Sequence, residues 1–217
     1  MPTTIDSYLA TYDRVDASRR HEPAWLRDMR RASAAAFGKL GFPTTKDEDW
    51  RFTNVAPIAG TSFMSAPPAA VARNAVSRFS VPGLSGPVLV FVNGRFAPRL
   101  SDLGTPLAGA TTVSLADAIA DDPASLQPHF GRHTDVTIRP FAALNTAMFE
   151  DGALIAIADN AVVEPAIQLV FLSTVTPVPA VCARHARAQQ PGACRGDVCR
   201  DRAVPRVHQR GDRGRRG

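Results

Sequence analysis

The sequence predicts an α+β protein built from three parts. Residues 1–80 carry apolar side chains mainly at helical spacing, residues 81–176 contain short β-branched runs, and residues 177–217 change abruptly in composition. We therefore expect a helical N-terminal region, a mixed segment that contains the first strands of a β-fold, and a disordered Arg-rich tail. A chain of 217 residues has room for one large domain or two small ones.

The clearest helix is predicted for Pro23–Leu40. Apolar or small residues recur there at the period of a helix with one buried face, at Leu26, Met29, Ser33, Ala36, Phe37 and Leu40. Pro23 suits the first turn of a helix, where its missing N–H has no consequence. Gly41 followed by Pro43 then supplies a stop signal.

A polar turn that leads into aromatic residues follows, at Thr44–Asn54. Thr45 with Glu48 three residues later predicts a capping box. The consecutive charges of Asp47–Asp49 cannot all face one substrate, so we interpret them as a solvated turn or helix start rather than acid–base catalysts. For Trp50–Phe52 we expect an anchored core aromatic beside a surface arginine, and a cation–π or stacking surface is the alternative.

Strand signals begin after about residue 81. Val88–Val92 is a β-branched and aromatic run that ends at Asn93 and Gly94, a strong hairpin-turn signal. Leu154–Ile157 and Ile167–Leu172 are predicted as two further short strands. Short apolar strands at this spacing are typical of a sandwich, a barrel or a stacked β-helix, and composition does not choose among them.

Two short helices are expected between these strands. Val113–Ala120 has the pattern of a strand end that runs into a helix, with Ser114 as N-cap and Asp121–Pro123 as its end. Phe141–Phe149 is predicted as the second helix.

No catalytic, cofactor-binding or metal-binding residue is predicted, and we do not expect an enzyme. The sequence has no P-loop, no Gly-x-Gly-x-x-Gly and no Gly-x-Ser-x-Gly motif. His129 and His133 have the spacing of a metal-binding pair on a helix. However, Pro128 precedes them and Gly131 lies between them, so we interpret them as exposed loop histidines.

The three cysteines all lie in the tail, at Cys182, Cys194 and Cys199, and they form no Cys-x-x-Cys motif. The sequence therefore predicts no zinc site there. The cysteine-free body is typical of a reducing compartment. No apolar run is long enough to span a membrane, and no secretory signal is recognised, so a cytoplasmic location is expected.

Positive charge is concentrated in the tail. Pro177–Gly217 holds 10 of the 25 basic residues and 3 of the 20 acidic ones, which leaves the body a net charge of −2. The run Arg210–Arg216 indicates an alternative function, that of a nucleic-acid-binding protein with a basic tail. The tail, however, has no aromatic residue for stacking on bases and no amphipathic period, so nucleic-acid binding is not favoured.

Gly41–Thr53 resembles the signature near the N-terminus of the SufD family, which are scaffold subunits of the SUF (SufBCD) iron–sulfur cluster assembly complex. Further segments resemble the same family in the same order, namely Trp25–Phe37, Phe91–Phe96, and Leu144–Ala147 with Phe149 and Asp151–Gly152. The resemblance covers roughly residues 23–173. It implies a scaffold role in iron–sulfur cluster assembly.

The resemblance also implies a longer chain. In that family a right-handed parallel β-helix and a C-terminal helical domain extend well beyond residue 217. A SufB-like homologue binds along the β-helix, and a SufC-like ATPase binds the C-terminal domain. The residues for cluster assembly lie in that missing part, so we expect no cofactor bound by this fragment and an impaired, truncated protein.

The tail itself has the properties of a sequence read out of frame. The chain contains 23 Arg and 2 Lys, which indicates a GC-rich gene. Val207–Arg216 can be back-translated so that the frame one base later reads Phe-Thr-Asn-Ala-Val-Thr-Glu-Val-Val, which resembles a β-helix rung of the SufD family. We therefore interpret residues 177–217 as a frameshift product, with the frame lost near residues 175–188.

Overall fold

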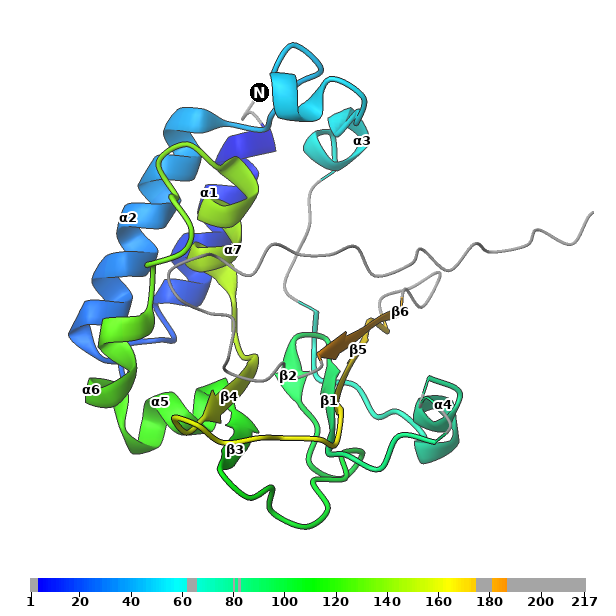
Figure 1. The fold of residues 1–217 in the computed structure, drawn as a ribbon. Helices are drawn as coiled ribbons and strands as arrows, with labels where there is room; N and C mark the ends of the chain where they lie inside the picture. The colour runs from blue at the N-terminus through cyan, green and yellow to red at the C-terminus, as the bar shows by residue number, and fades with distance from the viewer. Residues whose placement is uncertain (1–3, 62–65, 80, 82, 175–180, 187–217) are drawn as a thin grey trace, which may run out of the picture.

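The structure is a computed structural model, and it describes residues 4–61, 66–79, 81, 83–174 and 181–186 (Figure 1). Three helices stand side by side in a layer, at the left of Figure 1, and the strands lie below and to the right of them. The helices of the layer are α1 (Thr4–Asp16), α2 (Ala24–Leu40) and α7 (Pro140–Met148).

Small residues allow α2 and α7 to pack closely. Ser33 and Ala34 of α2 and Ala143 and Ala147 of α7 are all buried. The side of α1 that faces them contributes two tyrosine rings, so that Tyr8 packs with Phe37 and Ala143, and Tyr12 packs with Ala34 and Ala147. Burial raises the pKa of both tyrosines above its ordinary value.

The strands form two sheets. The larger has the order β2-β1-β5-β6, with β1 (Val88–Val92), β2 (Arg95–Phe96), β5 (Ile167–Leu172) and β6 (Val181–Ala186). In it β1 pairs with β5 in parallel, whereas the β1·β2 and β5·β6 pairs are antiparallel. The smaller sheet pairs β3 (Ala110–Ser114) with β4 (Ala153–Ile157) in antiparallel orientation.

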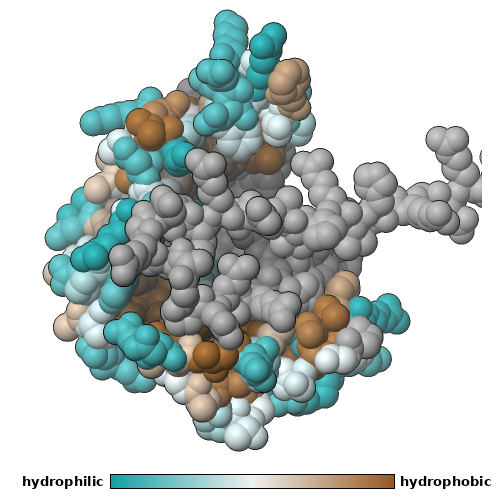
Figure 2. Space-filling model, viewed as in Figure 1, coloured by the Kyte–Doolittle hydropathy of each residue, from teal (hydrophilic) through white to brown (hydrophobic). Residues whose placement is uncertain are grey.

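Both faces of the larger sheet are covered. Val90 and Val170 pack on one face against Val76 from a short helix. Phe91 and Ile167 pack on the other face, where the smaller sheet contributes side chains of β4. Strands that are buried on both faces have near-continuous apolar sequences, and this accounts for the apolar runs in β1 and β5. In the view of Figure 2, hydrophobic side chains gather over the strand region.

In the described parts of the chain, six short helical segments lie between these elements. They are η1 (Glu48–Trp50), α3 (Ala56–Ala59), α4 (Arg73–Ser77), α5 (Leu115–Asp121), α6 (Pro123–Leu126) and η2 (Gln127–His129). Among the described residues no helix is both long and apolar enough to cross a bilayer.

The local predictions are largely confirmed. The long helix begins at Ala24 with Pro23 as its N-cap residue, and the strand Val88–Val92 has the predicted bounds. Asn93 and Gly94 turn the hairpin with φ of 51° and 81°, the left-handed values that such a turn needs. The hydroxyl of Ser114 accepts from Asp117 N, as predicted for the N-cap of α5.

The predicted arrangement of the later strands differs from the structure. Leu154–Ile157 and Ile167–Leu172 are strands, but they belong to different sheets, because β4 pairs with β3 while β5 pairs with β1. The α+β class is therefore confirmed, whereas the described residues contain no stacked rungs, and the start of a β-helix stays a prediction. The two regions that we expected on either side of residue 80 are in contact, because α7 of the second region packs against α2 of the first.

Strand β6 lies inside the segment that we expected to be a disordered tail, so the structure differs from that expectation over Val181–Ala186. The remainder of the predicted tail lies outside the described residues. That remainder includes Cys194, Cys199 and the run Arg210–Arg216.

Candidate functional site

Two buried arginines hold the C-terminal end of α7. Arg30 of α2 is 1% exposed, and its Nη1 donates to the carbonyl of Phe149 at 2.8 Å. Arg19, which follows α1, is 5% exposed and donates to three carbonyls at 3.0 Å each. The acceptors of the two arginines are the carbonyls of Thr146, Ala147, Met148 and Phe149. A helix leaves these last carbonyls without partners inside the helix and with a partial negative charge, so cations are favourable there.

Glu22 offsets one of the two positive charges of this arginine clamp, which consists of Arg19 and Arg30. Its two carboxylate oxygens accept from Nε and Nη2 of Arg30 at 2.8 and 3.0 Å, and Nε of Arg19 lies 3.8 Å from Oε1. The ring of Phe149 lies under the Arg30 guanidinium, 3.9 Å from it, which adds a cation–π contact. Burial and the neighbouring charge of Arg30 lower the pKa of Arg19.

Sequence reasoning missed this clamp. Arg30 lies one turn after Leu26 and two turns before Phe37, within the buried stripe of α2. Leu40, which we predicted to share that stripe, is 38% exposed. The detectable signal was an arginine in the middle of an apolar face, because such a residue is buried only with partners.

Asp151 joins the strands and helices just beyond the clamp. Its Oδ1 accepts from the hydroxyl of Ser114 at 3.0 Å and from the backbone N–H groups of Ala116 and Gly152 at 2.9 and 2.7 Å. Its Oδ2 accepts from Phe96 N at 2.9 Å. One carboxylate thus connects β2, the start of α5 and the start of β4.

The hairpin that follows β1 is tied to the same place. Arg95 forms an ion pair with Glu150, Nη2 to Oε2, at 2.6 Å, and its Nη1 donates to the carbonyl of Ala66 at 2.8 Å. Asn93 exchanges two hydrogen bonds with Thr174, at 2.8 and 2.9 Å. The segments Trp25–Phe37, Phe91–Phe96 and Leu144–Gly152 therefore meet around residues 149–151 as a structural junction.

The fourth signature segment, Gly41–Thr53, lies apart from that junction and forms a surface turn. Asp47 Oδ2 accepts from the N–H and hydroxyl of Thr44 at 2.6 and 3.1 Å, and Lys46 N donates to that hydroxyl. The predicted capping box of Thr45 and Glu48 is wrong. Asp47 occupies the N-cap position of η1, and the pairing of Asp47 with Thr44 closes the turn instead.

The three aromatic and basic residues at the end of this turn, Trp50, Arg51 and Phe52, differ in burial. Trp50 is half-buried and packs on Phe141, with 5.1 Å between ring centroids, so the predicted anchored aromatic is confirmed at this position. Phe52 is 94% exposed, and the Arg51 guanidinium lies 5.6 Å from its ring centroid, which is the stacking alternative. The acidic residues of Asp47–Asp49 are exposed, as expected for a solvated turn.

The turn is therefore our candidate functional site. An almost fully exposed phenylalanine has no packing role in the free chain, whereas aromatic and arginine side chains dominate the energetics of protein interfaces. Backbone hydrogen bonds from Trp50 N to Asp47 O and from Thr53 N to Trp50 O hold the turn in one conformation. A pre-formed turn lowers the conformational entropy that a partner must overcome on binding.

The other residues considered in the sequence form no metal site among the described residues. His129 and His133 are exposed, as predicted, and the described part of the chain holds no group of three potential metal ligands. Cys182 belongs to β6, and the other two cysteines lie outside the described residues.

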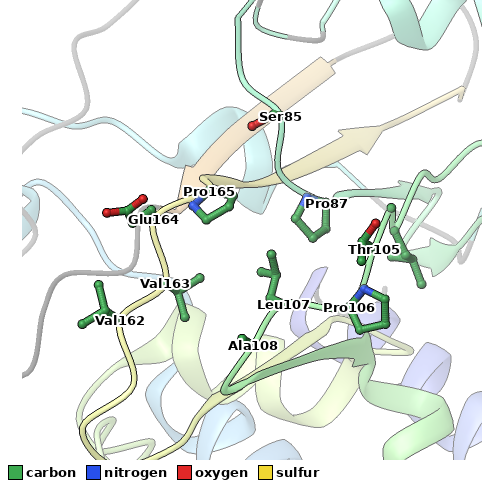
Figure 3. A pocket seen from close by; sticks show the side chains of 12 residues that line it. Ser85, Pro87, Thr105, Pro106, Leu107, Ala108, Val162, Val163, Glu164 and Pro165 are labelled. Atoms are coloured by element: carbon green, nitrogen blue, oxygen red, sulfur yellow. The ribbon is translucent and has the colours of Figure 1, made fainter.

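A cleft of about 530 Å³ opens among the loops beside the two sheets (Figure 3). Proline and aliphatic side chains provide much of its wall, including Pro87, Leu107 and Pro165. Its polar side chains, Ser85, Thr105 and Glu164, stand at separate edges and do not converge on one point. This arrangement provides no group of polar atoms that could act together on a bound molecule.

Comparison with known proteins gives two matches. The profile of the SufBD protein N-terminal region matches residues 3–169. An iron-sulfur cluster assembly SufBD family protein of Synechocystis sp. is 30% identical over 177 residues, which cover 82% of this chain and 39% of that protein. The chain thus spans well under half the length of this curated relative, and the family profile ends before the composition changes at residue 177.

Replacement of Arg30 by methionine is expected to destabilise the fold by about 3–5 kcal/mol, because the Glu22 carboxylate, whose side chain is only 13% exposed, and several carbonyls would lose their partner. The matched control is Arg31→Met, whose side chain is 66% exposed and pairs only with Asp28, so a change within about 0.5 kcal/mol is expected. Urea unfolding followed by circular dichroism measures both. Equal unfolding midpoints for the two variants would contradict the role of the clamp.

Phe52→Ala is expected to change the free energy of unfolding by no more than about 0.5 kcal/mol, because the ring is almost fully exposed. Phe37→Ala, which removes a ring that is 1% exposed, should cost about 3–5 kcal/mol. The same urea titration compares them. A loss for Phe52→Ala as large as that for Phe37→Ala would show that the ring packs into the fold and is not free for a partner.

Proposed function

The chain belongs to the SufBD family, and from this we propose that it is a SufD-type scaffold component of iron–sulfur cluster assembly. The observation that carries the proposal is the family match over residues 3–169. The structure adds a physical reason for three of the signature segments, since they meet at the arginine clamp and Asp151. The SufD type is supported by the order of the four segments along the chain.

The proposed role is binding rather than catalysis. These charged groups at the junction are engaged in the fold, because Arg19 and Arg30 hold α7, Glu22 holds Arg30, and Asp151 accepts four hydrogen bonds. The surface turn with Arg51 and Phe52 instead offers a rigid contact for a protein partner. We propose no cofactor bound by this fragment.

The proposed partners are a SufB-like homologue and a SufC-like ATPase. We propose that the full-length protein meets the first along a parallel β-helix and the second through a C-terminal domain, both beyond the segment shared with its relative. The parallel β1·β5 pair supports this, because parallel pairing is the strand geometry that a β-helix repeats.

We propose further that residues 177–217 are encoded out of frame. The support is the composition change at residue 177, where basic residues outnumber acidic ones by 10 to 3, and the profile match that ends at residue 169. The SufD-like string obtained one base later from Val207–Arg216 adds to this support.

Determination of the nucleotide sequence tests this proposal. A shift by one base near codons 175–188 should open a frame that continues as a SufD-like sequence past codon 217. If the nucleotide sequence confirms the present reading frame, and the frame one base later does not continue as a SufD-like sequence, the frameshift proposal is wrong.

A binding experiment tests the function itself. The frame-restored protein is expected to co-purify with the SufC-like ATPase and the SufB-like homologue of the same genome, whereas the 217-residue chain should lose at least about tenfold in affinity for the ATPase, equal to about 1.4 kcal/mol. Pull-down with each purified partner, followed by titration calorimetry, measures this. Failure of the frame-restored protein to bind either partner would contradict the scaffold role.

A further inference from the structure

A second cavity, of about 460 Å³, lies between α2, α7 and the segment 129–136. Its apolar wall includes Met29, Phe130 and Phe149, and its polar lining includes Ser33 and Arg132. Pockets of this volume accept small molecules that combine an apolar body with a few polar atoms. The scaffold role proposed above does not use this cavity.

The segment that covers the cavity is held in place by aromatic packing. The Phe130 ring lies between Trp25 and Phe149, with centroid distances of 5.2 and 6.1 Å. Gly131 follows with φ of 72°, and a Cβ at that position would lie 4.0 Å from Met29 Sδ, so the segment reaches the end of the Met29 side chain of α2. The polar residues that follow are therefore carried on an anchored backbone.

Ser33 provides an independent sign that a ligand belongs here. Its side chain is fully buried at 0% exposure and lines the cavity, yet its hydroxyl has no hydrogen-bond partner among the described residues. Buried hydroxyl groups nearly always have a partner, because a lost hydrogen bond to water is otherwise not replaced. A ligand oxygen in the cavity would supply one.

The charges of the lining select the kind of ligand. Arg132 lies between His129 and His133, and all three line the cavity. The one carboxylate in the lining, Asp151, already accepts four hydrogen bonds. The acid of the covering segment, Asp135, accepts from Thr137 N and Oγ1. The two histidines, which we interpreted from the sequence as exposed loop residues and not as a metal site, thus flank Arg132, whose positive charge disfavours a metal cation and favours an anion.

We propose that this cavity binds a small organic anion whose phosphate or carboxylate head group pairs with Arg132 and Ser33. The apolar body of that ligand would lie against Met29, Phe130 and Phe149. Arg132 supplies charge-assisted hydrogen bonds to the head group, and the Ser33 hydroxyl donates to one of its oxygens.

Calorimetric titration of the full chain with phenyl phosphate, benzoate and inorganic phosphate tests the proposal. One of the two aromatic anions should bind in a saturable manner at least about tenfold more tightly than inorganic phosphate, because the ring buries apolar surface. The tighter of the two identifies the head group. No saturable binding by either aromatic anion, or equal affinity for inorganic phosphate, would overturn the proposal.

Two variants separate ligand binding from structure. Arg132→Ala should weaken binding about tenfold, while Arg78→Ala, an exposed arginine outside the cavity, should leave it unchanged. Ser33→Ala should also weaken binding, but its free energy of unfolding should stay equal or rise, because the unpartnered hydroxyl is removed. Wild-type affinity in Arg132→Ala or Ser33→Ala would contradict the site, and Ser33→Ala keeps the test valid even if Arg132→Ala fails to fold.

Discussion

The fold depends on the buried guanidinium of Arg30. It is enclosed in the helical layer, and its charge is balanced by Glu22 on one side and by the carbonyl end of α7 on the other. A buried charge of this kind is tolerated only when the partners are fixed in place. The segment from Arg19 to Glu22 and the end of α7 must therefore both lie next to the Arg30 guanidinium.

That convergence determines where the sheets begin. α7 ends at Met148, and the next residues are the ones that contact the strands, through Glu150 with Arg95 and Asp151 with Phe96. The clamp thus sets the position of the β4 start relative to the helices. A change that frees the end of α7 would also move the Asp151 carboxylate, which accepts hydrogen bonds from β2 and from the start of α5.

The segments that resemble the SufD family consequently fall into two kinds. Trp25–Phe37, Phe91–Phe96 and Leu144–Gly152 contain the residues of the junction, so their roles are explained by folding. The turn in Gly41–Thr53 differs, because its most exposed residue, Phe52, is 94% exposed and is not packed into a hydrophobic cluster of the described residues. Contact with a protein partner is the role that we propose for it.

The sequence by itself determined the features that depend on near neighbours. The α2 helix, the Asn93–Gly94 hairpin and the Ser114 N-cap all arise from residues within a few positions of one another, so their patterns could be recognised. Only the tertiary structure decided that β4 and β5 join different sheets, that Arg30 is buried, and that Asp47 rather than Thr45 closes the signature turn. Strand partners and buried charges depend on residues far away in the chain, and the closure of the turn depends on a choice between competing local hydrogen bonds. The hydrophobic period of a segment contains information on neither.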